Sequence, residues 1–196
     1  MNLEALDKEI FLKINDFVGE VPVFDQLVKL VVNEYFVPVS IGLVLLYLWL
    51  HPGKKRKTHR RGLPIAILSV LMVNITIIVM NQFIISPRPF EQLPADLLFY
   101  RPTDPSFPSN AAAVGFALAT SIFLVNRKLG VGGILLASFY GFSRVYVGVH
   151  FPSDVIAGAL LGVLVALIIS RLRLLVNSLT ELLEKIQTKI KLDLDY

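Results

Sequence analysis

The sequence contains no cysteine, only three histidines and few charged residues. Without thiols, the chain forms neither disulfides nor thiolate metal sites. Charged residues make up 17% of the 196 residues and hydrophobic residues 55%, which is more apolar than an average soluble domain. Because the apolar residues are gathered in long blocks, we expect a single integral-membrane domain over residues 1–196.

The N-terminus lacks the uninterrupted apolar core of a secretory signal. Charged side chains interrupt the first twenty residues, among them Asp7, Lys8, Glu9 and Lys13. Residues 3–31 instead carry apolar positions at helical spacing, in two pieces separated by Gly19 and Pro22. Neither piece is long or apolar enough to cross a bilayer. Segment 1–33 is therefore predicted to form amphipathic helices at the membrane interface or on the bundle.

Long apolar runs dominate the rest of the chain, and a transmembrane helix needs about 20 such residues. The runs cover residues 35–50, 63–85, 108–125, 130–146 and 152–169. We expect an all-α fold, a polytopic transmembrane bundle of about five spanning helices with its core at 34–170. Residues 171–196 predict a C-terminal amphipathic helix. That helix is interpreted as a solvated cytoplasmic extension of the fifth span, with a dimerising or membrane-surface helix as the alternatives.

Lysine and arginine concentrate between the first two apolar runs, in the segment Lys54–Arg61. Such a segment can contact anionic lipid headgroups or nucleic acid. Apolar runs on both sides favour a cytoplasmic loop that obeys the positive-inside rule, and the uncharged run 63–85 argues against a soluble nucleic-acid-binding protein. The N-terminus then lies outside and the C-terminus inside. The polar segments around 86–107 and 144–154 meet at the outer face.

The residue types at that outer face suit phosphoryl transfer. Arg88 and Arg144 carry permanent charge in a fork that matches phosphate oxygens. The third apolar run, as a helix, offers free backbone N–H groups from Ser109 onward, with the Ser109 hydroxyl as a further donor. His150 and Asp154 lie four residues apart, so a local helix would place them on one face, where the carboxylate orients the imidazole as base or nucleophile.

Each of these features alone is ordinary in loops and helix starts, and their convergence on one membrane face carries the hypothesis. No metal or cofactor is expected. His51 and His59 lie on the far side, which leaves His150 as the histidine near the candidate site.

The same residues resemble a known signature, that of the type 2 phosphatidic acid phosphatase superfamily. The resemblance runs from about residue 60 to residue 170 and rests on Arg88-Pro89, Phe107-Pro108-Ser109-Asn110 and Ser143-Arg144 with His150 and Asp154. It implies a metal-independent phosphatase of membrane lipids with its site at the outer leaflet. By this resemblance His150 is the nucleophile that forms a phosphohistidine, and Asp154 orients it. The residues that would hold the phosphate are Arg88, Ser109, Asn110 and Arg144.

Two positions depart from the family's pattern. Asn81 stands where the first part of the signature usually has a lysine, so one phosphate-binding charge is missing. Ala111 stands where the second part usually ends in the histidine that protonates the leaving group, a contribution of roughly 10²–10⁴-fold. Three explanations are open: a His-to-Ala replacement that silences turnover, an enzyme whose leaving group needs little protonation, or a lipid-binding relative without activity.

The segment Asp104–Asn110 is most similar to that of bacterial undecaprenyl-diphosphate phosphatases. The leading hypothesis is therefore hydrolysis of a lipid phosphate or diphosphate in the bacterial inner membrane, with the site facing the periplasm and activity impaired by Ala111. Lipid A 1-phosphatase and phosphatidylglycerophosphate phosphatase are the alternative activities. A lipid-phosphate binding or transport protein is the rival from another class. The expected partners are lipid phosphates and, near Lys54–Arg61, anionic headgroups; the oligomeric state is left open.

Overall fold

The computed structural model describes residues 2–194, with side chains to residue 190. Helices are the regular elements of this part of the chain, which confirms the all-α class. Their bounds are α1 Leu3–Asn15, α2 Pro22–Val31, α3 Phe36–Leu50, α4 Arg56–Arg60, α5 Gly62–Met80, α6 Pro89–Gln92, α7 Asn110–Val125, α8 Arg127–Tyr146, α9 Pro152–Arg171 and α10 Arg173–Leu194.

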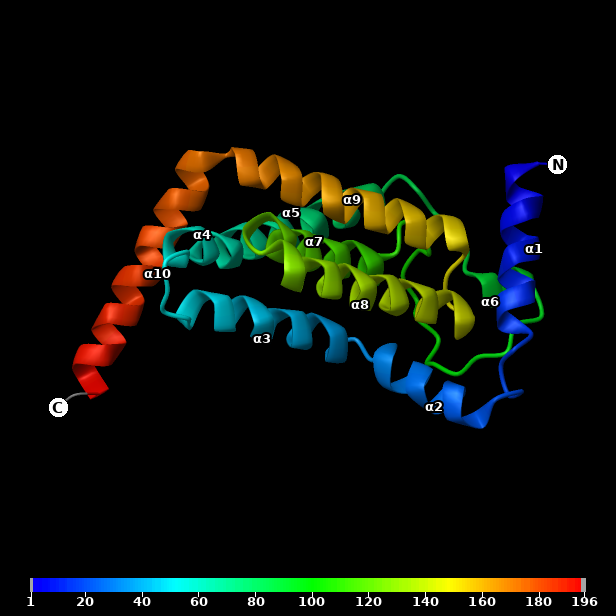
Figure 1. Cartoon of the computed structure of the whole chain (residues 1–196). Helices are drawn as coiled ribbons and strands as arrows, with labels where there is room; N and C mark the ends of the chain where they lie inside the picture. The colour runs from blue at the N-terminus through cyan, green and yellow to red at the C-terminus, as the bar shows by residue number, and fades with distance from the viewer. Residues whose placement is uncertain (1, 195–196) are drawn as a thin grey trace.

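Helices α3, α5, α7, α8 and α9 run side by side as a bundle (Figure 1). Helix α7 lies at the centre and packs against the other four. Its buried positions are mostly small, including Ala112, Ala113, Ala117 and Ala119, so its neighbours approach closely.

Two glycines of α9 allow a close approach to α7. A Cβ atom on Gly162 would lie 2.1 Å from the Ala113 carbonyl oxygen, and one on Gly158 would lie 2.3 Å from that of Ser109. Real Cβ atoms do not come this near, so both positions require glycine. This contact sets the start of α9 against the start of α7, where the Ser109 N–H donates to the Asp154 carbonyl at 3.0 Å.

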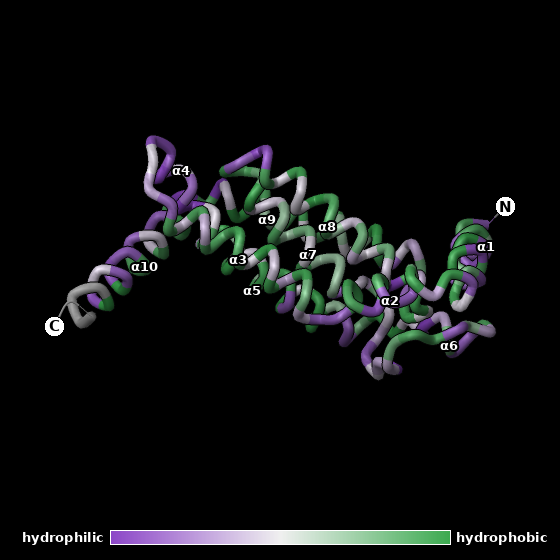
Figure 2. Tube along the Cα trace, turned by 60° about the horizontal axis from the view of Figure 1, so that its bottom comes forward, coloured by the Kyte–Doolittle hydropathy of each residue, from purple (hydrophilic) through white to green (hydrophobic). Residues whose placement is uncertain are grey.

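Two helical segments of the described chain are long and apolar enough to cross a membrane, Arg56–Met80 and Pro152–Arg171. Helices α2 and α3, bent by 56°, form a third if they count as one broken span. Large apolar side chains are exposed on the bundle's outside, and the tube is hydrophobic along its middle with hydrophilic segments gathered at its ends (Figure 2). These features indicate an integral membrane protein, while the count of five spans stays a prediction.

Two predicted helix bounds are wrong. The second run ends as a helix at Met80 rather than 85, where residues 81–83 form a turn, and Pro87 and Pro89 keep the residues before them out of the helical conformation. Asn81 and Arg88 are therefore not on one helix. Helix α8 starts at Arg127 rather than 130, because the Asn126 side chain accepts from Leu129 N–H at 3.2 Å and caps it.

The C-terminal helix does not continue α9 into solvent. Leu172 breaks the helix with a ψ of 67°, and α10 turns across the end of the bundle (Figure 1). Val176 is fully buried there, and Glu184 binds Arg60 at 2.5 Å. The predicted continuation of the fifth span is therefore wrong, although most described positions of α10 are exposed. Residues 195 and 196 of the predicted tail lie outside the described residues.

At the other end, α1 and α2 cover the bundle as the two separate N-terminal helices that were predicted. The Asn15 side chain donates to the Asp96 and Tyr146 carbonyls at 2.9 and 2.8 Å and accepts from Asp96 N–H at 2.8 Å. Tyr146 also donates to Asp25 at 2.6 Å. These bonds tie both N-terminal helices to the end of α8, where the candidate site lies.

Candidate functional site

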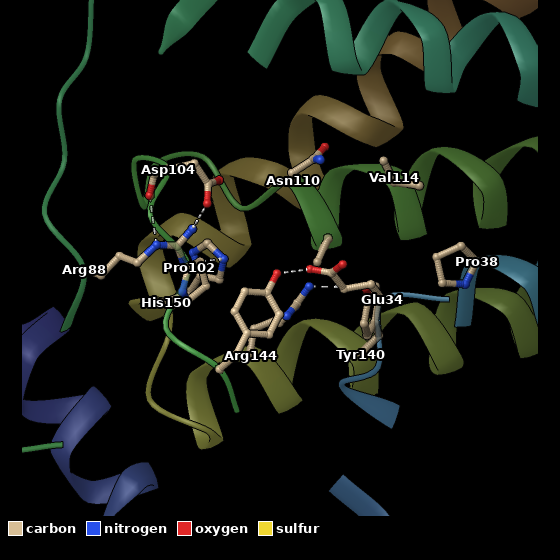
Figure 3. Close-up of a pocket in the computed structure, with 12 residues that line it drawn as sticks. Glu34, Pro38, Arg88, Pro102, Asp104, Asn110, Val114, Tyr140, Arg144 and His150 are labelled. Atoms are coloured by element: carbon tan, nitrogen blue, oxygen red, sulfur yellow. Dashed lines mark hydrogen bonds and ion pairs between the residues drawn. The ribbon is translucent and has the colours of Figure 1, made fainter. Parts of the chain in front are cut away.

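A cavity of about 230 Å³ opens between the start of α7, the end of α8 and the loop before α7. It brings together side chains from all three predicted stretches: Arg88, Ala111, Asn110, Arg144 and His150 (Figure 3). Glu34, Tyr100, Asp104 and Tyr140 also line it, and none of these was predicted.

A tight turn after α8 carries His150 back over the end of that helix. Gly148 adopts a φ of +87°, and a Cβ there would lie 3.1 Å from the Asp96 carbonyl. The N–H groups of Val149 and His150 both donate to the Arg144 carbonyl, at 3.2 and 3.3 Å. The turn therefore fixes His150 close to Arg144.

The neighbours of His150 define its tautomer. Nδ1 lies 2.9 Å from the Ser106 carbonyl oxygen, which can only accept, so Nδ1 carries the hydrogen. Nε2 lies 3.4 Å from Arg88 Nη1, which can only donate. Nε2 therefore presents its lone pair beside an arginine at the cavity.

His150 is only 5% exposed, and this burial is the main reason that its pKa is lowered. The charges of Arg88 and Arg144 lower the pKa further, while Asp154 raises it. The balance favours the neutral imidazole, the form with a free Nε2 lone pair.

Asp154 does not make the direct bond to His150 that the spacing suggested. Its Oδ2 lies 3.7 Å from His150 Nδ1, because His150 precedes α9 rather than lying on it. Oδ2 instead accepts from Ser106 Oγ at 2.5 Å and from Phe151 N–H at 2.8 Å. Ser106 thus joins the histidine to the aspartate, a role that only the folded arrangement reveals.

The Arg88 guanidinium donates hydrogen bonds to three oxygen atoms. Its Nε and Nη2 donate to the carbonyl and the carboxylate of Asp104, each at 2.9 Å, and Nη1 donates to the Val149 carbonyl at 2.9 Å. Its side chain is 4% exposed, whereas that of Asp104 is 61% exposed. Asp104 therefore lies between Arg88 and solvent, and dashed lines join the two residues in Figure 3.

Arg144 is buried without a counter-ion. Its guanidinium carbon lies 4.9 Å from the Phe99 ring centre and 5.3 Å from that of Tyr140, and Nη2 reaches Tyr140 Oη at 3.5 Å. No carboxylate of the described residues lies within ion-pair distance, and Nε has no hydrogen-bond partner. A buried cation in this state favours an anionic ligand.

The other predicted phosphate ligands are less well placed. Ser109 is fully buried as the N-cap of α7, accepts from Ala112 N–H at 3.4 Å and does not line the cavity. Its own N–H is bonded to Asp154, so the first free N–H of the helix belongs to a later residue. Asn110 and Ala111 do line the cavity. Asn81 lies away from it, at the end of α5.

As a whole, the cavity combines two arginines with a neutral, oriented imidazole. This set can bind a phosphate and present a nitrogen lone pair to it. Among the described residues, no group of three His, Asp or Glu side chains is spaced to hold a metal ion.

Comparison with known proteins agrees with the resemblance read from the sequence. The profile of the family described as the PAP2 superfamily matches residues 62–177. The bacitracin transport permease protein BcrC of Bacillus licheniformis is 33% identical over 86% of this chain and 81% of its own. The undecaprenyl-diphosphatase BcrC of Bacillus subtilis is 26% identical over 94% and 93%.

Solved structures show the same arrangement of helices. The structure of Aquifex aeolicus LpxE superposes with a TM-score of 0.68 and 29% identity, over 87% of this chain and 99% of that one. A PAP2-type phosphatidylglycerolphosphate phosphatase from Bacillus subtilis superposes with a TM-score of 0.63 over 87% and 86%. Its identity is 22%, so that likeness concerns the fold alone.

Proposed function

The chain belongs to the PAP2 superfamily, and we propose that it is a membrane lipid phosphatase acting on a lipid phosphate or diphosphate through a covalent phosphohistidine. The single observation that carries this proposal is the geometry around His150. A neutral imidazole presents Nε2 to a cavity in which Arg144 lacks a counter-ion. A phosphate between Arg88 and Arg144 would supply that counter-ion.

The first step exchanges one bond to phosphorus for another. The Nε2 lone pair of His150 forms the N–P bond while the P–O bond to the lipid breaks, and the leaving lipid takes the electron pair. Arg88 and Arg144 stabilise the charge on the equatorial oxygens. The imidazole becomes cationic, and Asp154 at 3.7 Å stabilises that charge while the Ser106 carbonyl keeps hold of Nδ1–H.

The second step returns the enzyme to its starting state. Water attacks phosphorus and forms a P–O bond, the N–P bond breaks, and the electron pair returns to Nε2. Inorganic phosphate leaves, one water proton goes to solvent, and the lipid group released in the first step takes a proton from solvent where it needs one. The net reaction is hydrolysis and needs no oxidant, reductant or cofactor.

A lipid diphosphate is the substrate class that best fits Ala111. Alanine cannot protonate a leaving group, and an alkoxide leaves poorly without a proton. A diphosphate instead releases a lipid monophosphate, which is a much better leaving group. Two relatives named undecaprenyl-diphosphatase point to the same class, one of them from Sulfolobus acidocaldarius and 35% identical over 66% of this chain and 60% of its own. Undecaprenyl diphosphate is therefore our lead substrate, ahead of lipid A and phosphatidylglycerophosphate.

The proposed orientation puts the active site at the outer leaflet of the bacterial inner membrane. It rests on the basic loop Lys54–Arg61, which favours the cytoplasmic side and contact with anionic headgroups. The phosphate cavity lies at the opposite end of the bundle, with α1 and α6 (Figure 1). Residues 34–170 form the membrane core of a single phosphatase domain.

Phosphate release from polyprenyl diphosphate tests this function. The Ala111→His variant is expected to release phosphate roughly 10²–10⁴-fold faster than the unsubstituted chain if protonation limits turnover, and at a similar rate if it does not. Adding His150→Ala to it should abolish release. Undiminished release from the double variant would contradict the histidine mechanism.

A second candidate is a protein that binds or transports a lipid phosphate without hydrolysing it. Ala111 in place of the usual histidine favours it, as does the name of the Bacillus licheniformis relative, a transport permease. This candidate predicts that the Ala111→His variant binds lipid phosphate but releases phosphate from none of the three substrates.

A further inference from the structure

A second charged cavity, of about 240 Å³, lies at the end of the bundle opposite His150. Its wall comes from the start of α5, the end of α7 and the junction of α9 with α10. Arg61, Arg171 and Arg173 line it, together with the hydroxyl residues Thr58 and Ser170. Three permanent cations from two segments, the start of α5 and the α9–α10 junction, thus meet in one hollow.

This cavity has no acidic lining to balance its arginines. No aspartate or glutamate of the described residues lines it. A larger hollow of about 580 Å³ shares Leu124 and Val125 with it, and that hollow is also basic, with Lys55, His59, Arg127 and Lys128. At the same end, Glu184 already binds Arg60. The positive charge around the end of α7 is therefore uncompensated within the described chain.

Two polar atoms beside these hollows lack partners. Arg61 Nε and His59 Nδ1 are both buried and form no hydrogen bond. Buried polar atoms in proteins are nearly always bonded, so each calls for an explanation. The positive-inside rule accounts for the number of basic residues here. It does not account for their convergence on one cavity or for a buried guanidinium nitrogen without an acceptor.

Apolar side chains adjoin the arginines on the outside of the bundle. Leu124, which lines the cavity, is 37% exposed, and Leu172, between Arg171 and Arg173 in the chain, is 42% exposed. A ligand with a phosphate group and acyl chains would contact both parts, whereas free phosphate would use the arginines alone. Basic pockets between transmembrane helices bind anionic headgroups in this way.

We propose that Arg61, Arg171 and Arg173 bind the phosphate of an anionic membrane phospholipid from the leaflet opposite the active site. Arginine suits this role because its planar fork binds two phosphate oxygens at once. The lipid would link α5 to the junction of α9 and α10. The inference is independent of the phosphatase activity, because none of these residues lines the His150 cavity.

The test compares two charge-matched variants in phosphatidylcholine nanodiscs with increasing phosphatidylglycerol. The site variant is Arg61→Gln/Arg171→Gln/Arg173→Gln. The control is Lys54→Gln/Arg56→Gln/Lys57→Gln, which removes three cations from exposed positions at the same end that line neither hollow. Phosphatidylglycerol should raise the melting temperature of the unsubstituted protein and, by somewhat less, that of the control, which loses only part of the diffuse attraction of the loop Lys54–Arg61 to anionic headgroups. The site variant should lose about tenfold more affinity than the control, as expected for lost charge-assisted hydrogen bonds.

Native mass spectrometry of the unsubstituted protein gives a readout that needs no variant. We expect one phosphatidylglycerol to be retained in preference to phosphatidylcholine. Equal loss of stabilisation in both variants would overturn the proposal, since it would show diffuse attraction to a charged surface. The last comparison measures the melting temperature with inorganic phosphate in place of the anionic lipid, at matched ionic strength. A shift equal to that of the lipid would contradict a lipid occupant.

Discussion

At the scale of single residues, the site is a chain of contacts in which each group orients the next. Asp154 holds Ser106, the Ser106 carbonyl holds Nδ1–H of His150, and Nε2 faces Arg88. Asp104 in turn holds Arg88. The residue types of the proposed nucleophile and its cations could be read from the sequence. The roles of Ser106 and Asp104 could not, because they arise from the path of a loop that has no helical period.

Ser106→Ala tests the link between aspartate and histidine. The change removes the hydroxyl that bonds Asp154 but keeps the carbonyl that bonds His150. We expect kcat for phosphate release by the Ala111→His form to fall by about tenfold, the effect of one charged hydrogen bond, with little change in KM. Ser138→Ala, an exposed serine of α8, is the control. A kcat equal to that of the control would show that the Ser106 hydroxyl does not assist catalysis.

Asp104→Asn tests whether the carboxylate competes with substrate for Arg88. The amide keeps an oxygen acceptor but loses the charge that repels a phosphate. The pair is partly exposed and its contribution small, so we expect KM to fall by about threefold while kcat changes less. Asp96→Asn makes the same charge change at an exposed position of the same loop. A higher KM would show that Asp104 instead positions Arg88 for binding.

The pH dependence of kcat/KM tests the protonation state of His150. Its pKa is lowered, mainly by burial, so the neutral nucleophile persists to lower pH than for an ordinary histidine. Activity should therefore be lost only as pH falls through that lowered pKa. Asp154 raises the pKa of His150, so Asp154→Asn should move the acid limb further down in pH while reducing kcat. A limb that moves to higher pH would contradict this arrangement.

At the scale of elements, close packing of α7 on α9 determines how the residues of the site are positioned. The apolar runs predicted where the bundle helices lie, since a membrane-length run is a strong signal. Helix ends were predicted less well, as at Met80 and Leu172, because a local break or a tertiary contact decides them. The contact of Gly162 with Ala113 fixes the distance between the starts of the two helices, which carry Asp154 and Ser109.

Gly162→Ala should destabilise the bundle and lower activity. The new Cβ would lie 2.1 Å from the Ala113 carbonyl, so α9 must move away from α7. We expect a destabilisation of about 1–3 kcal/mol, typical of overpacking, seen as a lower melting temperature in detergent. Gly132→Ala on α8 meets nothing within 4 Å and should be neutral or slightly stabilising, because alanine favours helix. Equal melting temperatures for the two variants would contradict the packing account.

At the scale of the whole molecule, an apolar bundle separates two different polar ends. One end holds His150 with two arginines, and the other holds the basic cavity of Arg61, Arg171 and Arg173. In the sequence, the basic loop Lys54–Arg61 was enough to predict that the two ends of the bundle differ in charge. The covering of one end by α1 and α2, and of the other by α10, depends on long-range bonds such as Asn15 to Tyr146 and Arg60 to Glu184, which no local pattern encodes.

The central claim is that His150 carries the phosphoryl group. The most direct measurement uses the Ala111→His protein with undecaprenyl diphosphate labelled at its terminal phosphate, stopped by rapid denaturation in alkali, where phosphohistidine survives. The account predicts label on the peptide that contains His150 and none in the same protein with His150→Ala. Release of labelled phosphate at an undiminished rate by the His150→Ala protein would contradict it.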